Sequence, residues 1–223
     1  MIPTCKKLYL CNQSLDPLCV INGLRTETVD LHIRIKDYST LSFEVDKYIN
    51  IDGELVLSNG YDELNVYMYI YLEDVGYFKM QHPSIINDGN NEIKTINSNS
   101  IEQEFEDKDW INFKCNTGET DSLEQLATDN LNDLGFAKEF VKFYNPKNKE
   151  LSLLHIILTK MPGWTINDDD IDPLLWDTKL SLNESNINLY ALLTSRIAPK
   201  ADCIFIFNII NRTIKAIHKN NLD

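Results

Sequence analysis

Basic residues are scarce in this chain, and they are scattered. The 223 residues include 21 lysines and arginines against 34 aspartates and glutamates, so the formal net charge is -13 at pH 7. No run of basic residues occurs in the sequence. Because contacts to nucleic-acid phosphates need clustered lysine and arginine, the composition argues against a surface built for specific nucleic-acid binding.

Long apolar segments are also missing. A helix that crosses a bilayer needs about 18 to 20 consecutive apolar residues. No segment of this chain approaches that length, and the N-terminal stretch MIPTCKKLYLC lacks the apolar centre of a signal peptide. We therefore expect no membrane association and a protein that is made and folds in the cytoplasm.

The cysteines form no recognisable pattern. They are an odd number, five, with no CxxC pair: Cys5, Cys11, Cys19, Cys115 and Cys203. Neither a zinc site nor a complete disulfide framework fits this spacing. The sequence predicts reduced, partly buried thiols.

Local signatures of catalysis and of nucleotide binding are absent. The chain contains no GxSxG, HExxH, GxxxxGK or GxGxxG motif. Its four histidines, His32, His82, His155 and His218, are scattered singly, whereas bases and metal ligands occur in constellations. We therefore predict no catalytic residue, no cofactor and structural histidines.

One acidic loop offers candidates for a cation site. Asp168, Asp170 and Asp172 alternate along the loop, with Asp169 between them, and alternate carboxylates can converge on a hard cation such as calcium. The loop lacks the glycine at position six and the terminal glutamate of an EF-hand. A solvated acidic loop is the favoured interpretation, so no metal site is predicted.

What the chain does contain is an ordinary globular composition, 43% hydrophobic and 25% charged. From Lys7 to about Asn99, short apolar or alternating runs are separated by turn residues, and the loop DGELVLSNGYDEL interrupts the series. The predicted strands are 7–11, 17–21, 29–35, 41–45, 67–72, 76–81 and 91–97. About seven such strands favour a small antiparallel barrel or sandwich.

The second half of the sequence changes character. Asp121 and Glu124 form a capping box that predicts a short helix over 122–129. A strongly apolar helix is expected to begin after Ser152 and to end at Pro162-Gly163. The residues that follow predict a strand over 164–166, and TKLSLNE predicts a second one.

The last segment, from Asn186 to Lys219, predicts a helix and a hairpin. Apolar residues at helical spacing run up to Pro199, which should end the helix. Two apolar runs, 203–207 and 213–218, then flank a polar turn. A hairpin and one helix cannot bury both of their faces alone, so other elements must complete this segment.

Tyrosines around the fifth predicted strand suggest a different function. Aromatic rings on an exposed strand can stack on sugars, although alternation more often places them half in the core and half in cross-strand pairs. The residues concerned are Tyr67, Tyr69, Tyr71, Tyr77 and Phe78.

Several stretches, in order and over nearly the whole chain, resemble the N-terminal region of phage and prophage tail-tip proteins, the tail-associated lysin or prophage endopeptidase tail family. They are LYLCNQSLDPLCVINGL, LSFEVDKYI, SNGYDEL, YLEDVGYFKM, NTGETDSLEQLA, KFYNPKNKELSLLHIILTKMPGWTI and YALLTSRIAPKADCIFIFNIINRTI. The resemblance implies a fold similar to the baseplate hub of contractile-tailed phages, α+β and mainly antiparallel β, with two barrel-like domains in each subunit.

Applied to this chain, the resemblance divides it into three parts. Residues 1–100 would form a first barrel-like domain, and residues 101–178 a linking α+β domain. Residues 179–223 would be the helix and hairpin that begin a second barrel, whose remaining strands would follow Asp223. The sequence itself contains nothing to carry a hydrolase activity.

The resemblance also implies a role and partners. The protein would be a homotrimeric hub in the virion tail, assembled in the bacterial host cytoplasm, that adapts the sixfold tail tube to the threefold tip. Its neighbours would be other tail proteins: the distal tail protein, the tape measure and the tail tube. The alternatives are a carbohydrate-binding or adhesin module and the non-catalytic part of a tail-associated cell-wall hydrolase.

Overall fold

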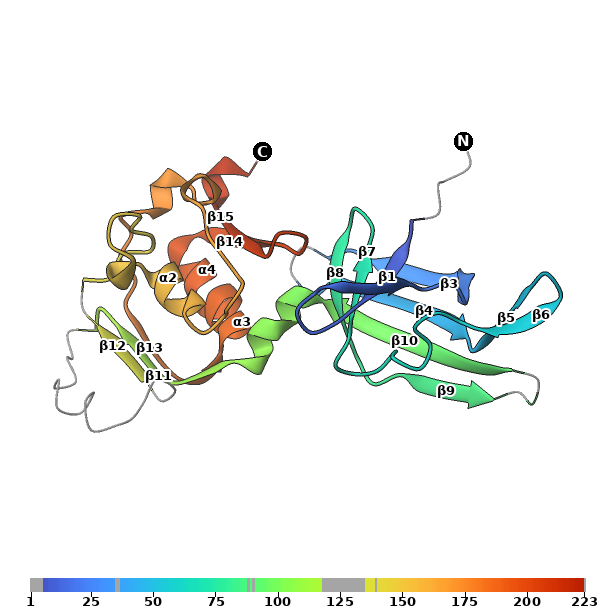
Figure 1. Cartoon of the computed structure of the whole chain (residues 1–223). Coiled ribbons are helices and arrows are strands. Elements are labelled where there is room, and N and C mark those ends of the chain that lie inside the picture. Colours follow the sequence, from blue (N-terminus) through green and yellow to red (C-terminus); the bar gives the residue numbers. More distant parts are fainter. Residues whose placement is uncertain are drawn as a thin grey trace. The chain divides into compact units, whose positions relative to one another are not determined.

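The fold is α+β and mainly antiparallel β, in two compact units, Met1–Gln103 and Glu104–Asp223 (Figure 1). The computed structural model describes residues 6–34, 37–87, 89, 91–117, 135–138 and 140–222. Each unit has buried side chains of its own, and each is described by itself.

The first unit is an antiparallel sheet with the strand order β2-β1-β7-β8-β10-β4-β3, and β9 pairs with β10 beside this path. The strands are β1 (Leu8–Cys11), β2 (Pro17–Val20), β3 (Leu24–His32), β4 (Thr40–Asp46), β7 (Tyr69–Leu72), β8 (Gly76–Met80), β9 (Ser84–Asn87) and β10 (Glu92–Ser100). Strands lie at all seven predicted positions, so the alternation of apolar and polar residues located this sheet correctly.

The alternation of apolar and polar residues matches the observed burial in β4 but only in part in β3. In β4, Leu41, Phe43 and Val45 are buried, as expected for the inner face of a strand. In the segment predicted as 29–35, Ile33 is 71% exposed because β3 ends at His32 and pairs only with β4 at the border of the sheet.

The predicted barrel is not closed. In the described part of the unit, β2 and β3 are the two ends of the hydrogen-bonded order and do not pair with each other. The side chains of β2 are mostly exposed, so this strand has no second layer to cover it. The result is an open sheet rather than a barrel.

The interrupting loop contains a second, separate sheet. Tyr48–Ile51 (β5) pairs with Glu54–Leu57 (β6), and all four side chains of β6 are exposed. The turn residues Asp52 and Gly53 have φ values of 54° and 93°, the positive pair that a type I′ hairpin turn requires. The amide oxygen of Asn50 accepts a hydrogen bond from the Gly53 N–H and fixes the turn.

The second unit has a three-stranded sheet with β11 (Asp109–Cys115) in the centre. It pairs in parallel with β12 (Gly135–Lys138) and antiparallel with β13 (Leu182–Asn188). Before β11, the 3-10 helix η1 (Ile101–Asp107) spans the boundary between the two units. The predicted helix 122–129 lies outside the described residues.

The apolar helix of this unit is α2 (Leu153–Leu158). It begins after Ser152 as predicted, and its side chains are buried on almost every side. Its N-terminal neighbour is the 3-10 helix η2 (Lys149–Leu151). The acidic loop forms two further 3-10 turns, η3 (Asp168–Asp170) and η4 (Pro173–Leu175).

The helix predicted from Asn186 differs from the observed one at both ends. Residues up to Asn188 belong to β13, and the Asn188 side chain caps the helix by accepting a hydrogen bond from the Ala191 N–H at 2.7 Å. The helix then continues through α3 (Leu189–Ala191), a π-helical stretch (Leu192–Ile197) and α4 (Ala198–Ala201).

The prediction that Pro199 ends this helix was therefore wrong. Pro199 lies in the first turn of α4, directly after the π-helical stretch. The first turn of a helix segment tolerates proline, because an N–H there has no obligatory intrahelical partner. The helix ends at Asp202, which adopts the left-handed conformation (φ 50°).

The hairpin β14 (Cys203–Asn208) and β15 (Thr213–His218) forms where it was predicted, but its partners were not foreseen. Isolated parallel bridges join Thr165 to Thr213 and Ile171 to Ala216. After β15, the 3-10 helix η6 (Lys219–Asn221) follows. The expected strand 164–166 is reduced to the single bridge at Thr165.

The boundary expected after residue 178 does not separate compact units. Residues 179–223 belong to the same unit as 104–178, because β13 completes the β11 sheet and the hairpin packs on the earlier residues. The buried rings of Phe105 and Trp164 both contact Phe207 of the hairpin, with centroid distances of 5.3 and 5.9 Å. Residues before 178 therefore supply packing partners for the hairpin.

Candidate functional site

The acidic loop does not gather its carboxylates around one point. Asp168 Oδ1 accepts a hydrogen bond from the Tyr144 hydroxyl at 2.6 Å, and burial together with this bond raises the pKa of Tyr144. Asp170 Oδ2 accepts from the Asn167 side-chain amide at 2.8 Å. The two carboxylates are thus held by separate partners.

Asp172 is a structural carboxylate. It accepts hydrogen bonds from the Leu174 N–H (3.0 Å), the His218 N–H (3.2 Å) and the Asn221 side chain (2.6 Å), so it ties the loop to the end of β15. Burial opposes ionisation, but these donors outweigh it and lower the pKa of Asp172. Within the described ranges, no three His, Cys, Asp or Glu side chains are grouped so that they could hold a metal ion.

The histidines lie apart from one another. His155, on α2, has Nδ1 at 2.8 Å from the Ser152 hydroxyl and stacks on Tyr144. Burial first, and then the positive charge of Lys149, lower the pKa of His155, so the neutral ring is favoured. His32 pairs with Asp30 on an exposed strand. The Ser152 hydroxyl beside His155 belongs to a fully buried residue, so this serine is not exposed to a substrate.

Three tyrosines form a row across the first sheet. Tyr9 (β1), Tyr71 (β7) and Tyr77 (β8) are register partners, with ring centroids 6.0 and 4.8 Å apart. The other three residues of the predicted aromatic set lie outside this row. Tyr69 is half-buried on β7, in register with Cys11 and Lys79. Tyr67 is 69% exposed in the turn before β7, and Phe78 is fully buried and cannot contact a ligand.

Exposed apolar side chains concentrate on two other segments of the first unit, β5–β6 and β9. We call them together the apolar strand surface, residues 48–57 and 84–87. Leu55 is 75% exposed and Ile85 is 58% exposed. Its other exposed apolar residues are Tyr48, Ile51, Val56, Leu57 and Ile86. An apolar patch of this kind marks an interaction surface more often than a scattered residue does.

Both segments adjoin the beginning of β10. The Asn91 side chain donates hydrogen bonds to Asp46 Oδ1 (2.9 Å) and to the Tyr48 carbonyl (3.4 Å), and the Lys47 N–H donates to the Glu92 carbonyl at 2.8 Å. In Figure 1, β5, β6 and β9 accordingly project at the same end of the sheet. In the described structure β6 pairs only with β5 and β9 only with β10, so each strand keeps an open backbone edge.

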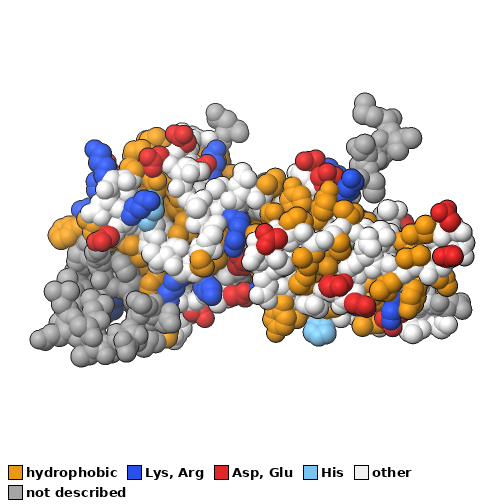
Figure 2. All heavy atoms as spheres, in the orientation of Figure 1, with side chains coloured by type: hydrophobic (Ala, Val, Ile, Leu, Met, Phe, Trp, Pro, Cys, Tyr) orange, Lys and Arg blue, Asp and Glu red, His pale blue; other side chains and the backbone are white. Residues whose placement is uncertain are grey.

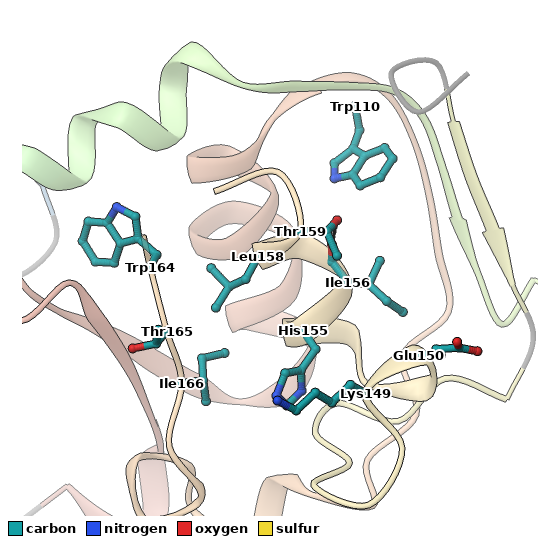
Figure 3. A pocket seen from close by; sticks show the side chains of 10 residues that line it. All are labelled: Trp110, Lys149, Glu150, His155, Ile156, Leu158, Thr159, Trp164, Thr165 and Ile166. Carbon is teal, nitrogen blue, oxygen red and sulfur yellow. Dashed lines mark hydrogen bonds between the residues drawn. The ribbon is translucent and has the colours of Figure 1, made fainter. Parts of the chain in front are cut away.

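The second unit contains a groove of about 600 Å³ beside α2 (Figure 3). One wall is α2, with His155, Ile156, Leu158 and Thr159, and the other is the extended segment 164–166. Trp110 of β11 and the residues Lys149 and Glu150 complete the lining. The volume lies in the range of ligand pockets, roughly 300 to 1,000 Å³.

On the face shown in Figure 2, the charged side chains of the described residues are interspersed rather than gathered by sign. Among the described helices, none is long and apolar enough to cross a membrane.

Comparisons with known proteins bear on the fold. No family model and no curated protein matches this sequence. Among solved structures, the chain is similar to the crystal structure of prophage tail protein gp18 from Listeria monocytogenes EGD-e. The TM-score is 0.57 with 13% sequence identity, and the match covers 96% of this chain but 51% of that one. The chain therefore has the fold of a prophage tail protein and spans about half the length of this relative.

Two of these features, the β5–β6 hairpin and the groove, were not predicted from the sequence. The β5–β6 hairpin has a local signal, the dipeptide Asp52-Gly53 between apolar residues, that favours a type I′ hairpin. The groove has no such signal, because its lining comes from positions 110, 149–159 and 164–166, which only the fold brings together.

Proposed function

We propose that this protein is a structural component of a phage or prophage tail tip or baseplate. In this proposal it forms a homotrimeric hub that adapts the sixfold tail tube to the threefold tip during assembly and host attachment. The observation that carries the proposal is the structural likeness to a prophage tail protein over 96% of the chain. The place of action is the virion tail, after assembly in the host cytoplasm.

The apolar strand surface supports an assembly role. A heterologous contact repeated around a threefold axis closes a ring, and open strand edges with apolar side chains are suited to such contacts. Strands β6 and β9 each offer four exposed side chains and an open edge. Other tail proteins, namely the distal tail protein, the tape measure and the tail tube, are the proposed neighbours of the ring.

The proposed role is structural and not catalytic. Among the described residues, no three His, Cys, Asp or Glu side chains gather at one point, and the serine that contacts His155 is fully buried. Both observations are consistent with a non-catalytic part of a tail-associated protein. Clearing of cell-wall substrate in a zymogram by this chain would contradict the assignment.

Labelling of particles tests the proposal. Gold-conjugated antibodies raised against this chain are expected to mark the tail tip of purified particles in electron micrographs. Labelling of capsids alone would rule out a tail-tip location. So would the absence of any label on particles in which mass spectrometry detects the chain.

The tyrosine row favours a second candidate function, carbohydrate binding. The hydroxyls of Tyr9, Tyr71 and Tyr77 have no hydrogen-bond partner among the described residues, so rings and hydroxyls together could engage a sugar. Binding on a glycan array that is lost in Tyr71→Ala and kept in Tyr67→Ala would support this function.

A further inference from the structure

One wall of the groove beside α2 is the extended segment 164–166, which pairs with the hairpin at Thr165 on one side only. Both backbone groups of Thr165 bond to the hairpin segment. The Thr165 N–H donates to the Arg212 carbonyl at 2.9 Å, and the Thr165 carbonyl accepts from the Ile214 N–H at 3.1 Å. Successive residues of an extended chain direct their backbone groups to opposite sides. Those of Ile166 therefore face away from β15, and they have no partner within the described residues.

Figure 3 shows the surroundings of this segment, and Ile166 is one of the residues that line the groove. The segment 164–166 runs beside α2, and the side chains of Ile166 and Leu158 border the space between them. Ile156 and Trp164 present apolar surface to the same space while being almost fully buried. A helix on one side and an open strand edge on the other are the features of grooves that take up an extended peptide as an added strand.

The charged side chains at one end of the groove indicate which chemical group a bound ligand would carry there. The Lys149 side chain lies alongside the His155 ring, whereas the Glu150 carboxylate points away from it (Figure 3). The exposed Lys149 makes no ion pair with another described residue, and the Ser152 hydroxyl contacts Nδ1 of His155. In the tautomer in which the Ser152 hydroxyl donates to Nδ1, the neutral His155 ring carries its proton on Nε2. The Lys149 ammonium and this Nε2–H are then two donors without an acceptor, and a carboxylate is the group that complements them.

We propose that the groove binds an extended segment of a partner protein, apolar at alternate positions and carrying a carboxylate that reaches Lys149 and His155. The segment pairs with the Ile166 backbone and places its apolar side chains against Ile156 and Trp164. This binding site is independent of the ring assembly proposed above, because it uses none of the residues of the apolar strand surface.

The test uses the whole ¹⁵N-labelled chain and a defined probe, the acetylated peptide Val-Thr-Val-Ile-Val with a free carboxylate. We expect the amide signal of Ile166 and the indole signals of Trp110 and Trp164 to shift on titration. The indole of Trp176, which lies outside the groove lining and donates to the Ile171 carbonyl, serves as the unshifted control. The absence of a shift at Ile166 at millimolar peptide would overturn the proposal.

Related probes separate the contributions. The same peptide with a C-terminal amide is expected to bind about tenfold more weakly, since it lacks the charge-assisted hydrogen bonds. A backbone N-methylated peptide is expected to lose binding. Decanoate has the apolar chain and the carboxylate but no peptide groups. If decanoate shifts the same signals with the affinity of the free-acid peptide, the site is a lipid-type pocket and the proposal fails.

Protein variants provide the matched comparison. Lys149→Gln is expected to remove the preference for the free acid while leaving the affinity for the amide unchanged. Thr159→Phe fills the groove from an exposed position of its lining and is expected to abolish binding. Ser195→Phe, at an exposed helical position outside the lining, is expected to bind as the unmodified chain does. Equal binding by Thr159→Phe and Ser195→Phe would place the peptide elsewhere.

Discussion

Glu102 is a carboxylate that the first unit buries without completing its hydrogen bonds. Oε1 accepts from the Ser100 hydroxyl at 2.6 Å, whereas Oε2 is buried and has no partner in the described structure. Burial raises the pKa of Glu102 above its ordinary value of 4.5. The folded state then holds this proton more tightly than the unfolded state, so the contribution of Glu102 to stability is fully present below pH 4.5 and is lost as the pH rises through its folded pKa.

Glu102→Gln is therefore expected to stabilise the protein at pH 7. The amide removes the buried charge and keeps the shape, and the gain should be about 1 to 2 kcal/mol. Urea unfolding at pH 4 and pH 7 measures it, with the exposed Glu106→Gln as the control. The explanation fails if the two variants unfold alike at pH 7, or if the gain is as large at pH 4 as at pH 7.

Among the elements, the hairpin β14–β15 is the one whose packing the sequence left open. It packs through an aromatic cluster around the fully buried Phe105. The centroid of the Phe105 ring lies 4.9 Å from that of Trp164 and 5.3 Å from that of Phe207. Glu104 strengthens the same contact, because its Oε2 accepts from Arg212 at 2.9 Å and from the Trp164 indole at 3.3 Å.

Phe105→Ala is expected to destabilise the second unit by about 3 to 5 kcal/mol, because it leaves a cavity between elements that cannot close in on it. Phe140→Ala, at a ring that is largely exposed, is the control and should change stability by less than about 0.5 kcal/mol. Denaturant unfolding followed by tryptophan fluorescence, with all three tryptophans in this unit, gives both values. Equal effects of the two substitutions would contradict the packing.

The structural elements also differ in how well the sequence predicted them. Period-2 alternation predicted β4 and its buried face, because a half-buried strand must alternate. The predicted helix boundaries near Asn188 and Pro199 were wrong. Capping and a π-helical stretch depend on hydrogen bonds, and a hydrophobic pattern does not reveal these. The pairing of β13 with β11 and the docking of the hairpin join distant residues, so no local pattern could predict them, and the groove depends on the same long-range contacts.

At the scale of the whole molecule, the account rests on assembly through the apolar strand surface. Leu55→Glu and Ile85→Glu place charges on this surface, where a buried, unpaired charge would be costly, and are expected to weaken self-association at least about tenfold. Ile33→Glu is the matched control, since Ile33 is as exposed as Leu55 but lies outside the surface. Concentration series in size-exclusion chromatography with light scattering compare the three. Similar losses in all of them would mean that net charge and not this surface governs association.

Sedimentation equilibrium of the unmodified chain over a wide range of concentrations tests the central claim most directly. A trimeric hub predicts a species of three times the protomer mass of 25.8 kDa, populated as the concentration rises. A mass that stays at 25.8 kDa at every concentration would contradict self-assembly of this chain into a ring.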